Sequence, residues 1–98
     1  MEEKLKMLCE KITKETQERL KKSNLDCQVN LDHAICRYEI GKKYVKINDK
    51  TSGKYMVEIS SENIYGIKAY GVIHKGHYYG NLDSINNYFW GEFRAIKI

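Results

Sequence analysis

The residues with the greatest chemical potential lie together in one segment of the chain, from Ile64 to Leu82. Its nineteen residues, IYGIKAYGVIHKGHYYGNL, include four glycines, four tyrosines, two histidines and two lysines. Glycine lets backbone N–H groups approach an anion, tyrosine offers a flat face and a hydroxyl, and lysine and histidine supply positive charge. A nucleotide needs this combination, because its base stacks on an aromatic ring and its phosphate takes hydrogen-bond donors and cations.

We therefore expect a ligand or partner site in and around this segment. The predicted ligand-binding residues are Tyr65, Lys68, Tyr70, His74, Lys75, His77, Tyr79, Asn81 and Arg94. A structural interpretation stands beside this one, in which Tyr65, Tyr70 and Tyr78 fill the core of a small sheet and the glycines shape bulges. Both interpretations can hold, because alternate residues of a strand face opposite sides of a sheet.

Catalysis and metal binding have little support in the sequence. His74 and His77 lie in HKGH, which we expect to form a turn, and a turn does not fix two imidazoles as a helical pair would. The chain has no HExxH pattern, Walker loop, GxSxG elbow or GxGxxG fingerprint. The set Cys27, His33 and Cys36 lacks the paired short spacings of a zinc site. We predict a protein that is not an enzyme and that uses no metal and no cofactor.

The composition predicts one globular domain spanning residues 1–98. Of the 98 residues, 42% are hydrophobic, which is enough for a packed core. The net charge is +4, and the positive excess lies mainly in residues 41–98, beside most of the aromatic residues. Such a charge attracts an anion locally but falls short of the lysine clustering of a dedicated duplex-DNA binder.

The location of the protein is also expected from the sequence. No apolar run approaches the roughly 20 residues that cross a bilayer, so we expect no membrane association. The first residues, MEEKLKMLCEK, interleave charges with apolar residues and do not resemble a signal peptide. The chain has three cysteines, an odd number, which suits reduced thiols acting as small apolar fillers. We expect a cytoplasmic protein.

The elements that must position the site begin with a helix over residues 2–22. Leu5, Leu8, Ile12 and Leu20 recur at helical spacing, with Thr16 between the last two. From residue 25 the period changes to two, and LDCQVNLD predicts a half-buried strand. Residues 33–40 are predicted to form a second strand, and Gly41 begins a turn.

The remainder of the chain has strand composition. KYVKIN and KYMVEIS flank a DKTSG loop and form the clearest predicted hairpin. Residues 60–63 predict a turn, YYGNL a short strand, DSINNYFW a single helical turn capped by Asp83 or Ser84, and GEFRAIKI a last short strand. Gly66 and Gly71 predict bulges. The fold class is α+β: one long N-terminal helix (2–22) followed by a small, strongly twisted antiparallel sheet (25–98).

The second half of the chain resembles small accessory proteins of bacteriophages, especially those that infect low-GC Gram-positive hosts. The resemblance covers roughly residues 43–91. It rests on an order of motifs: YVKI, the Ser52–Lys54 loop, YMVEI, the IYGIK unit at 64–68 and the YGNLD closure at 79–83. In overall plan the chain is also similar to the anti-defence sponges that sequester cyclic ADP-ribose-type signals of the Thoeris system. These have an N-terminal helical part, an antiparallel sheet, and aromatic- and arginine-lined pockets shared across an oligomer.

The resemblance implies a phage-encoded, non-enzymatic inhibitor of bacterial immunity that acts in the host cytoplasm as a homo-oligomer. Its partner would be a small nucleotide signal of the cyclic ADP-ribose or cyclic nucleotide type. One alternative is a protein-directed inhibitor, such as an anti-CRISPR, that docks onto a host defence protein. A second alternative is a nucleic-acid-binding accessory protein.

Overall fold

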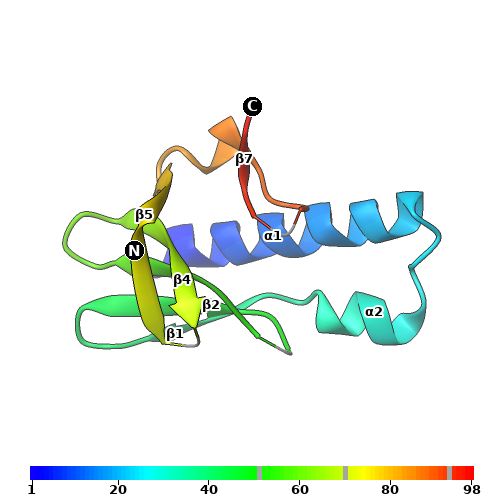
Figure 1. The fold of residues 1–98 in the computed structure, drawn as a ribbon, viewed down its shortest axis with the longest axis horizontal. Coiled ribbons are helices and arrows are strands. Elements are labelled where there is room, and N and C mark those ends of the chain that lie inside the picture. Colours follow the sequence, from blue (N-terminus) through cyan, green and yellow to red (C-terminus); the bar gives the residue numbers. More distant parts are fainter. Residues whose placement is uncertain (51, 70, 93) are drawn as a thin grey trace.

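A computed structural model describes residues 1–50, 52–69, 71–92 and 94–98. Two helices, α1 (Glu2–Lys22) and α2 (Gln28–His33), precede five strands: β1 (Arg37–Ile40), β2 (Tyr44–Asn48), β3 (Gly53–Glu58), β4 (Asn63–Ala69) and β5 (Val72–Asn81). A 3₁₀ turn, η1 (Ile85–Asn87), and two short strands, β6 (Tyr88–Phe89) and β7 (Ile96–Lys97), follow. Figure 1 shows α1 lying along the long axis of the molecule, with the sheet around its N-terminal half and α2 beside its C-terminal end. The α+β class, with its long N-terminal helix, is confirmed.

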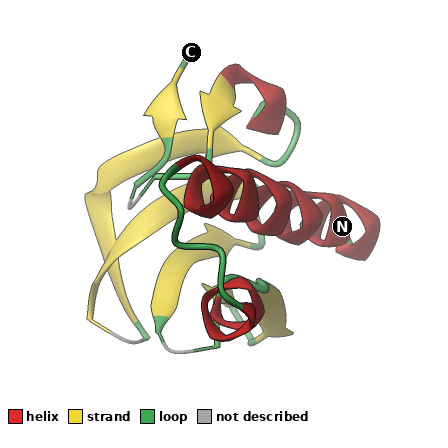
Figure 2. Ribbon diagram, turned by 90° about the vertical axis from the view of Figure 1, so that its right-hand side faces the viewer, coloured by secondary structure: helices red, strands yellow, loops and turns green. Residues whose placement is uncertain are grey.

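The main sheet is an antiparallel meander in the order β1-β2-β3-β4-β5, and it is open at both edges. β6 and β7 pair separately as a two-stranded ribbon. The strands curve around one side of α1 (Figure 2). In the part of the chain that the structure describes, no helix is both long and apolar enough to cross a membrane.

The core lies between α1 and the sheet face that it covers. Leu5, Leu8, Ile12 and Thr16 are buried as the helical spacing predicts, while Leu20 is only half-buried. From the sheet, every second residue of β2 and β3 reaches the same core: Val45, Ile47, Tyr55 and Val57. Ile64, Tyr79 and Trp90 complete it. The predicted hairpin is therefore confirmed as β2–β3, and alternate residues of its strands face the core.

The strand predicted over residues 25–32 is wrong, because the segment forms a loop followed by α2. Its apolar residues are not buried: Leu25 is 52% exposed and Val29 is 60% exposed. Local hydrogen bonds replace strand pairing, since Gln28 Nε2 donates to Asp32 Oδ1 at 2.8 Å and Asn30 Nδ2 donates to the Leu25 carbonyl at 2.8 Å. The second strand, predicted over residues 33–40, is shorter than predicted. Residue 33 still belongs to α2, and β1 covers only the last four residues of the predicted strand.

The turn predicted at HKGH is also wrong. The chain reverses between Ala69 and Val72, where Gly71 has a φ of +75°. HKGH instead lies inside β5, which also contains all but the last residue of the predicted short strand YYGNL. The turn predicted at residues 60–63 is confirmed, and so is a helical turn at η1. Ser84 occupies its N-cap position, but its side chain bonds to Asn81 rather than to the turn.

The C-terminal segment is fastened to α1. The Trp90 N–H donates to Glu15 Oε1 at 2.7 Å, and Arg19 Nε donates to the Gly91 carbonyl. The Trp90 indole N–H donates to the Ile85 carbonyl at 2.9 Å. These bonds hold residues 90 and 91 against α1. Arg94, which lines the candidate site described below, follows three residues later, so the helix helps to position it.

Candidate anion-binding site

Four of the predicted ligand-binding residues line one cavity of about 350 Å³: Lys68, His77, Tyr79 and Arg94. The cavity lies between β3, β4, β5 and the C-terminal segment. Residues that the sequence analysis did not select complete its wall, chiefly Asp49, Lys54 and Tyr55. Its volume lies at the lower end of the range of small-molecule sites.

A bulge in β5 directs His77 into the cavity. In the β4–β5 register Tyr65 lies opposite Tyr78, and the next residue, Gly66, lies opposite His74. The three residues from Lys75 to His77 therefore have no opposite residue in β4. A bulge of this kind bends the strand and changes the direction of its side chains. A bulge at Gly66 was predicted, although its extra residues belong to the partner strand.

The two histidines of HKGH stack on each other inside this bulge. Their ring centroids are 4.1 Å apart and the rings are within 2° of parallel. The Gly76 N–H donates to His74 Nδ1 at 3.1 Å, which fixes the outer ring of the stack. Of the two rings, only His77 lines the cavity. His74 contributes to the site by stacking against His77.

Gly66 leaves the space that His77 occupies. A Cβ at this position would lie 2.8 Å from the His77 Cβ and 3.3 Å from its Nδ1. We expect Gly66→Ala to lower the free energy of unfolding by about 1–3 kcal/mol, the usual cost of overpacking. Urea denaturation followed by circular dichroism measures this loss. The double variant Gly66→Ala/His77→Gly moves the Cβ from one strand to the other and should recover part of it. Equal losses in the single and double variants would contradict this account of the contact.

Positive charge dominates the electrostatics of the cavity. Lys54, Lys68 and Arg94 face one acidic residue, Asp49. The Arg94 guanidinium acts on three of the aromatic and imidazole groups in the wall. Partial burial, then the charges of His74 and Arg94, lower the pKa of His77, and the Arg94 charge partly opposes the burial that raises the pKa of Tyr55 and of Tyr79. Because the Arg94 charge interacts with three side chains of this wall, it is close enough to the cavity to attract an anion into it.

The back wall of the cavity is aromatic. The Tyr55 and Tyr79 rings meet edge to face with centroids 5.3 Å apart, and Trp90 packs against Tyr55 at 5.2 Å. The buried Tyr55 hydroxyl lies near the Ala95 backbone but has no hydrogen bond of ordinary geometry. Burial is the main cause of the raised pKa of Tyr55, so its hydroxyl stays protonated.

His77 should make folding stability depend on pH. Its partial burial, and then the charges of His74 and Arg94, lower its pKa below the ordinary 6.5. As pH falls, the His77 imidazole of the unfolded chain is protonated before that of the folded chain. The contribution of neutral His77 to folding stability is therefore full above pH 6.5, and it is lost as pH falls towards the lower pKa of the folded state. We expect the free energy of unfolding to fall more in the native protein than in His77→Gln between about pH 7.5 and about pH 5.5. Parallel profiles for the two proteins would contradict this.

The structure separates the other predicted residues from the cavity. Tyr65 and Lys75 lie together on the opposite face of the sheet, with Lys75 Nζ 5.9 Å from the centre of the Tyr65 ring. Tyr70 lies outside the described residues. Tyr65, His74, Lys75 and Asn81 do not line the cavity, so the structure does not bring all nine residues together there, and a role for these four in binding stays a prediction.

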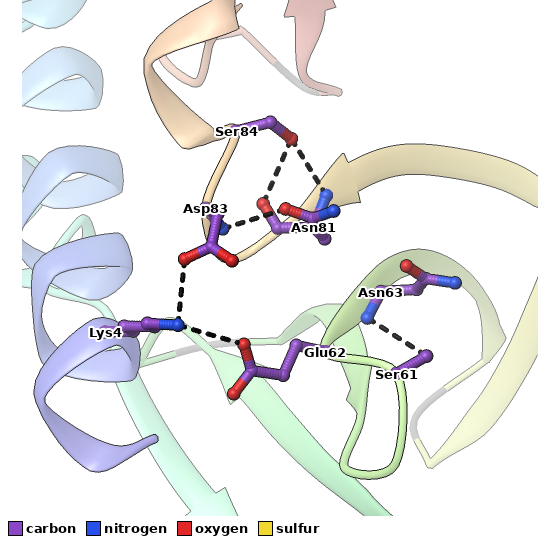
Figure 3. Close-up of polar contacts among 7 residues, drawn as sticks. All are labelled: Lys4, Ser61, Glu62, Asn63, Asn81, Asp83 and Ser84. Atoms are coloured by element: carbon purple, nitrogen blue, oxygen red, sulfur yellow. Dashed lines mark hydrogen bonds and ion pairs between the residues drawn. The ribbon is translucent and has the colours of Figure 1, made fainter.

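Asn81 instead shapes the turn after β5 (Figure 3). Its side-chain oxygen accepts from the Asp83 N–H at 2.9 Å, and its own N–H donates to Ser84 Oγ at 3.0 Å. Lys4 of α1 bridges Asp83 at 2.8 Å and Glu62 at 3.2 Å in the same view. Asn81 therefore helps to fix the end of β5 against the helix.

The residues that the sequence analysis missed were only partly detectable. Tyr55 alternates with Val57 in a predicted strand, so its burial followed from the pattern, but its place in a site did not. Asp49 and Lys54 flank the DKTSG loop, and sequence alone does not show that this loop lies beside β4 and the C-terminal segment. Within the described residues, no group of three or more histidine, cysteine or acidic side chains is placed to hold a metal ion.

Comparison with protein-family models, with curated proteins and with solved structures finds no match for this chain. A partly open hollow, an aromatic back wall and three cations against one carboxylate are features of a site for a small anion that also carries an aromatic or apolar group.

Proposed function

We propose that this chain is a non-enzymatic binding protein that captures a small phosphate-bearing nucleotide in the cavity between β3, β4 and β5. The observation that carries the proposal is the convergence of Lys54, Lys68 and Arg94 around a wall made by Tyr55, Tyr79 and His77. The cations hold phosphate oxygens, with Arg94 able to donate two parallel hydrogen bonds. The half-buried His77 ring, rather than the buried Tyr55 and Tyr79 rings, is the part of this wall that receives the base or ribose.

The side chains of the cavity fit binding of a ligand better than covalent catalysis. The Ser52 hydroxyl on the cavity wall donates to Asp49 Oδ1 at 3.3 Å, so its hydrogen bond goes to a carboxylate rather than to a histidine. A nucleophile activated by a neighbouring base is the usual requirement for covalent catalysis. Binding of an anion requires only the charge and shape described above.

The biological setting that we propose is inhibition of bacterial immunity by a phage, in the host cytoplasm, through removal of a nucleotide signal. Support comes from the resemblance of residues 43–91 to phage accessory proteins and from the anion-attracting cavity. Stoichiometric capture requires tight binding, because the protein must compete at signalling concentrations. Assembly into a homo-oligomer stays a prediction, which light scattering after size-exclusion chromatography can measure.

A panel of melting temperatures tests the binding proposal. The panel contains ADP-ribose, cyclic ADP-ribose and cyclic mono- and dinucleotides, with adenosine and ribose 5-phosphate as the two half-ligands. A ligand present at about 100 times its Kd stabilises the folded state by about 2.7 kcal/mol, which corresponds to roughly 10–20 °C for a domain of this size. At least one phosphate-bearing nucleotide should produce such a shift, and adenosine should not. A flat panel would overturn the proposal.

A further inference from the structure

The sheet has a second face, on the side opposite the core, and its side chains form a surface of their own. Lys46 lies opposite Met56, Met56 opposite Tyr65, and Tyr65 opposite Tyr78, so one row crosses four strands. Residues opposite one another in a sheet point to the same side. Their chain neighbours Val45, Val57, Ile64 and Tyr79 belong to the core, so this row faces away from it. We name this row, with Tyr44 and Lys75, the outer face.

The outer face presents tyrosine rings that are held in place. Tyr65 and Tyr78 contact each other with centroids 5.8 Å apart and an angle of 53° between the rings. Asn63 Nδ2 donates to the Tyr65 hydroxyl at 3.3 Å. Met56 is buried beneath them, whereas Tyr78 is 51% exposed. A rigid, exposed ring on a buried base is a platform on which another flat group can stack.

Lysines surround these rings. Lys75 Nζ lies 5.9 Å from the centre of the Tyr65 ring and 3.5 Å from Glu58 Oε2. A neighbouring hollow of about 390 Å³ is lined by Lys42, Lys43, Tyr44, Glu58 and Lys75, among others. With Lys46, four lysines therefore lie on or beside the outer face, and two acids, Glu58 and the Glu39 that lies opposite Lys46, only partly offset them.

We propose that the outer face binds single-stranded nucleic acid, with bases stacked on Tyr78 and Tyr65 and the backbone along the lysines. Positive charge beside sequential aromatic rings is the arrangement that binds single strands without sequence preference. The same charge argues against a protein partner, because lysine is depleted in protein–protein interfaces. The outer face is the surface of a sheet and presents no helix that enters a duplex groove.

Fluorescence anisotropy with labelled single-stranded DNA and RNA oligonucleotides tests this inference. We expect binding that weakens steeply between about 50 mM and about 200 mM salt. Tyr78→Ala should weaken binding by about 5- to 150-fold, while Tyr78→Phe keeps the ring and should bind like the native protein. Lys46→Gln and Lys75→Gln should each reduce the slope of log K against log salt by about 0.7. Lys22→Gln, on α1, is the matched control and should leave the slope unchanged.

Two results would overturn the inference. One is unchanged anisotropy with every oligonucleotide at low salt, which would leave the outer face to a protein partner or to none. The other is binding that Tyr78→Ala and the lysine variants leave intact. Arg94→Gln lies in the cavity and should not alter oligonucleotide affinity, so the outcome here is independent of whether the cavity captures a nucleotide.

Discussion

Replacement of Trp90 by alanine is expected to lower the free energy of unfolding by about 3–5 kcal/mol, a large share of the stability of a domain this small. Trp90 is completely buried. Its ring contacts Tyr55 at 5.2 Å and Tyr88 at 5.8 Å, and its indole N–H donates to the Ile85 carbonyl. The variant loses this packing, leaves a cavity and removes one of two hydrogen bonds to the Ile85 carbonyl, which also accepts from the Tyr88 N–H.

Urea denaturation followed by far-ultraviolet circular dichroism measures this loss, since Trp90 is the one tryptophan and its fluorescence disappears with it. Trp90→Phe is the control because it keeps a buried ring and loses the hydrogen bond, so its loss should be clearly smaller. A loss below about 1 kcal/mol for Trp90→Ala would show that the C-terminal segment does not contribute to the core as described.

Arg94→Gln is expected to weaken nucleotide binding by about 10- to 150-fold, the effect of losing about 1.5–3 kcal/mol from hydrogen bonds to a charged group. Folding stability should change by no more than about 0.5 kcal/mol, because Arg94 is exposed. A large effect on affinity with a small effect on stability distinguishes a binding residue from a structural one. Lys68→Gln should behave in the same way, with a smaller loss of affinity.

Isothermal titration calorimetry with the best ligand of the melting panel measures these affinities. Arg94→Lys should fall between the native protein and Arg94→Gln, because lysine keeps the charge but not the paired donors. Lys97→Gln removes a charge from β7, away from the cavity lining, and should bind like the native protein. If Arg94→Gln and Lys97→Gln bound equally well, Arg94 would have no role in capture.

The helix and the central hairpin could be predicted because their own residues determine them. Leu5, Leu8 and Ile12 recur at 3.6 residues, and residues 44–58 alternate around a turn-forming loop. The strand predicted at residues 25–32 failed for the opposite reason. Its alternation also fits a surface loop and a short helix, and no neighbouring strand was available to bury Leu25 or Val29.

The candidate site was half predictable because its geometry depends on the bulge in β5. Composition pointed to the correct region, and four of the nine predicted residues line the cavity. A regular strand would place His74 and His77, three residues apart, on opposite faces. The bulge brings them into a stack instead, and only the pairing with β4 reveals it. Tyr65 lies on the outer face because it pairs with Met56 and Tyr78 rather than with core residues.

The most direct test of the central claim is to locate the bound nucleotide by NMR. Backbone and histidine ring signals are followed while ADP-ribose, or the best ligand of the melting panel, is added to the native protein. Capture in the cavity predicts that the largest shifts fall on Gly66, Lys68 and His77, with little change at Tyr78 on the outer face. Shifts centred on Tyr65 and Tyr78, or no shifts at all, would contradict the claim that this cavity is the nucleotide site.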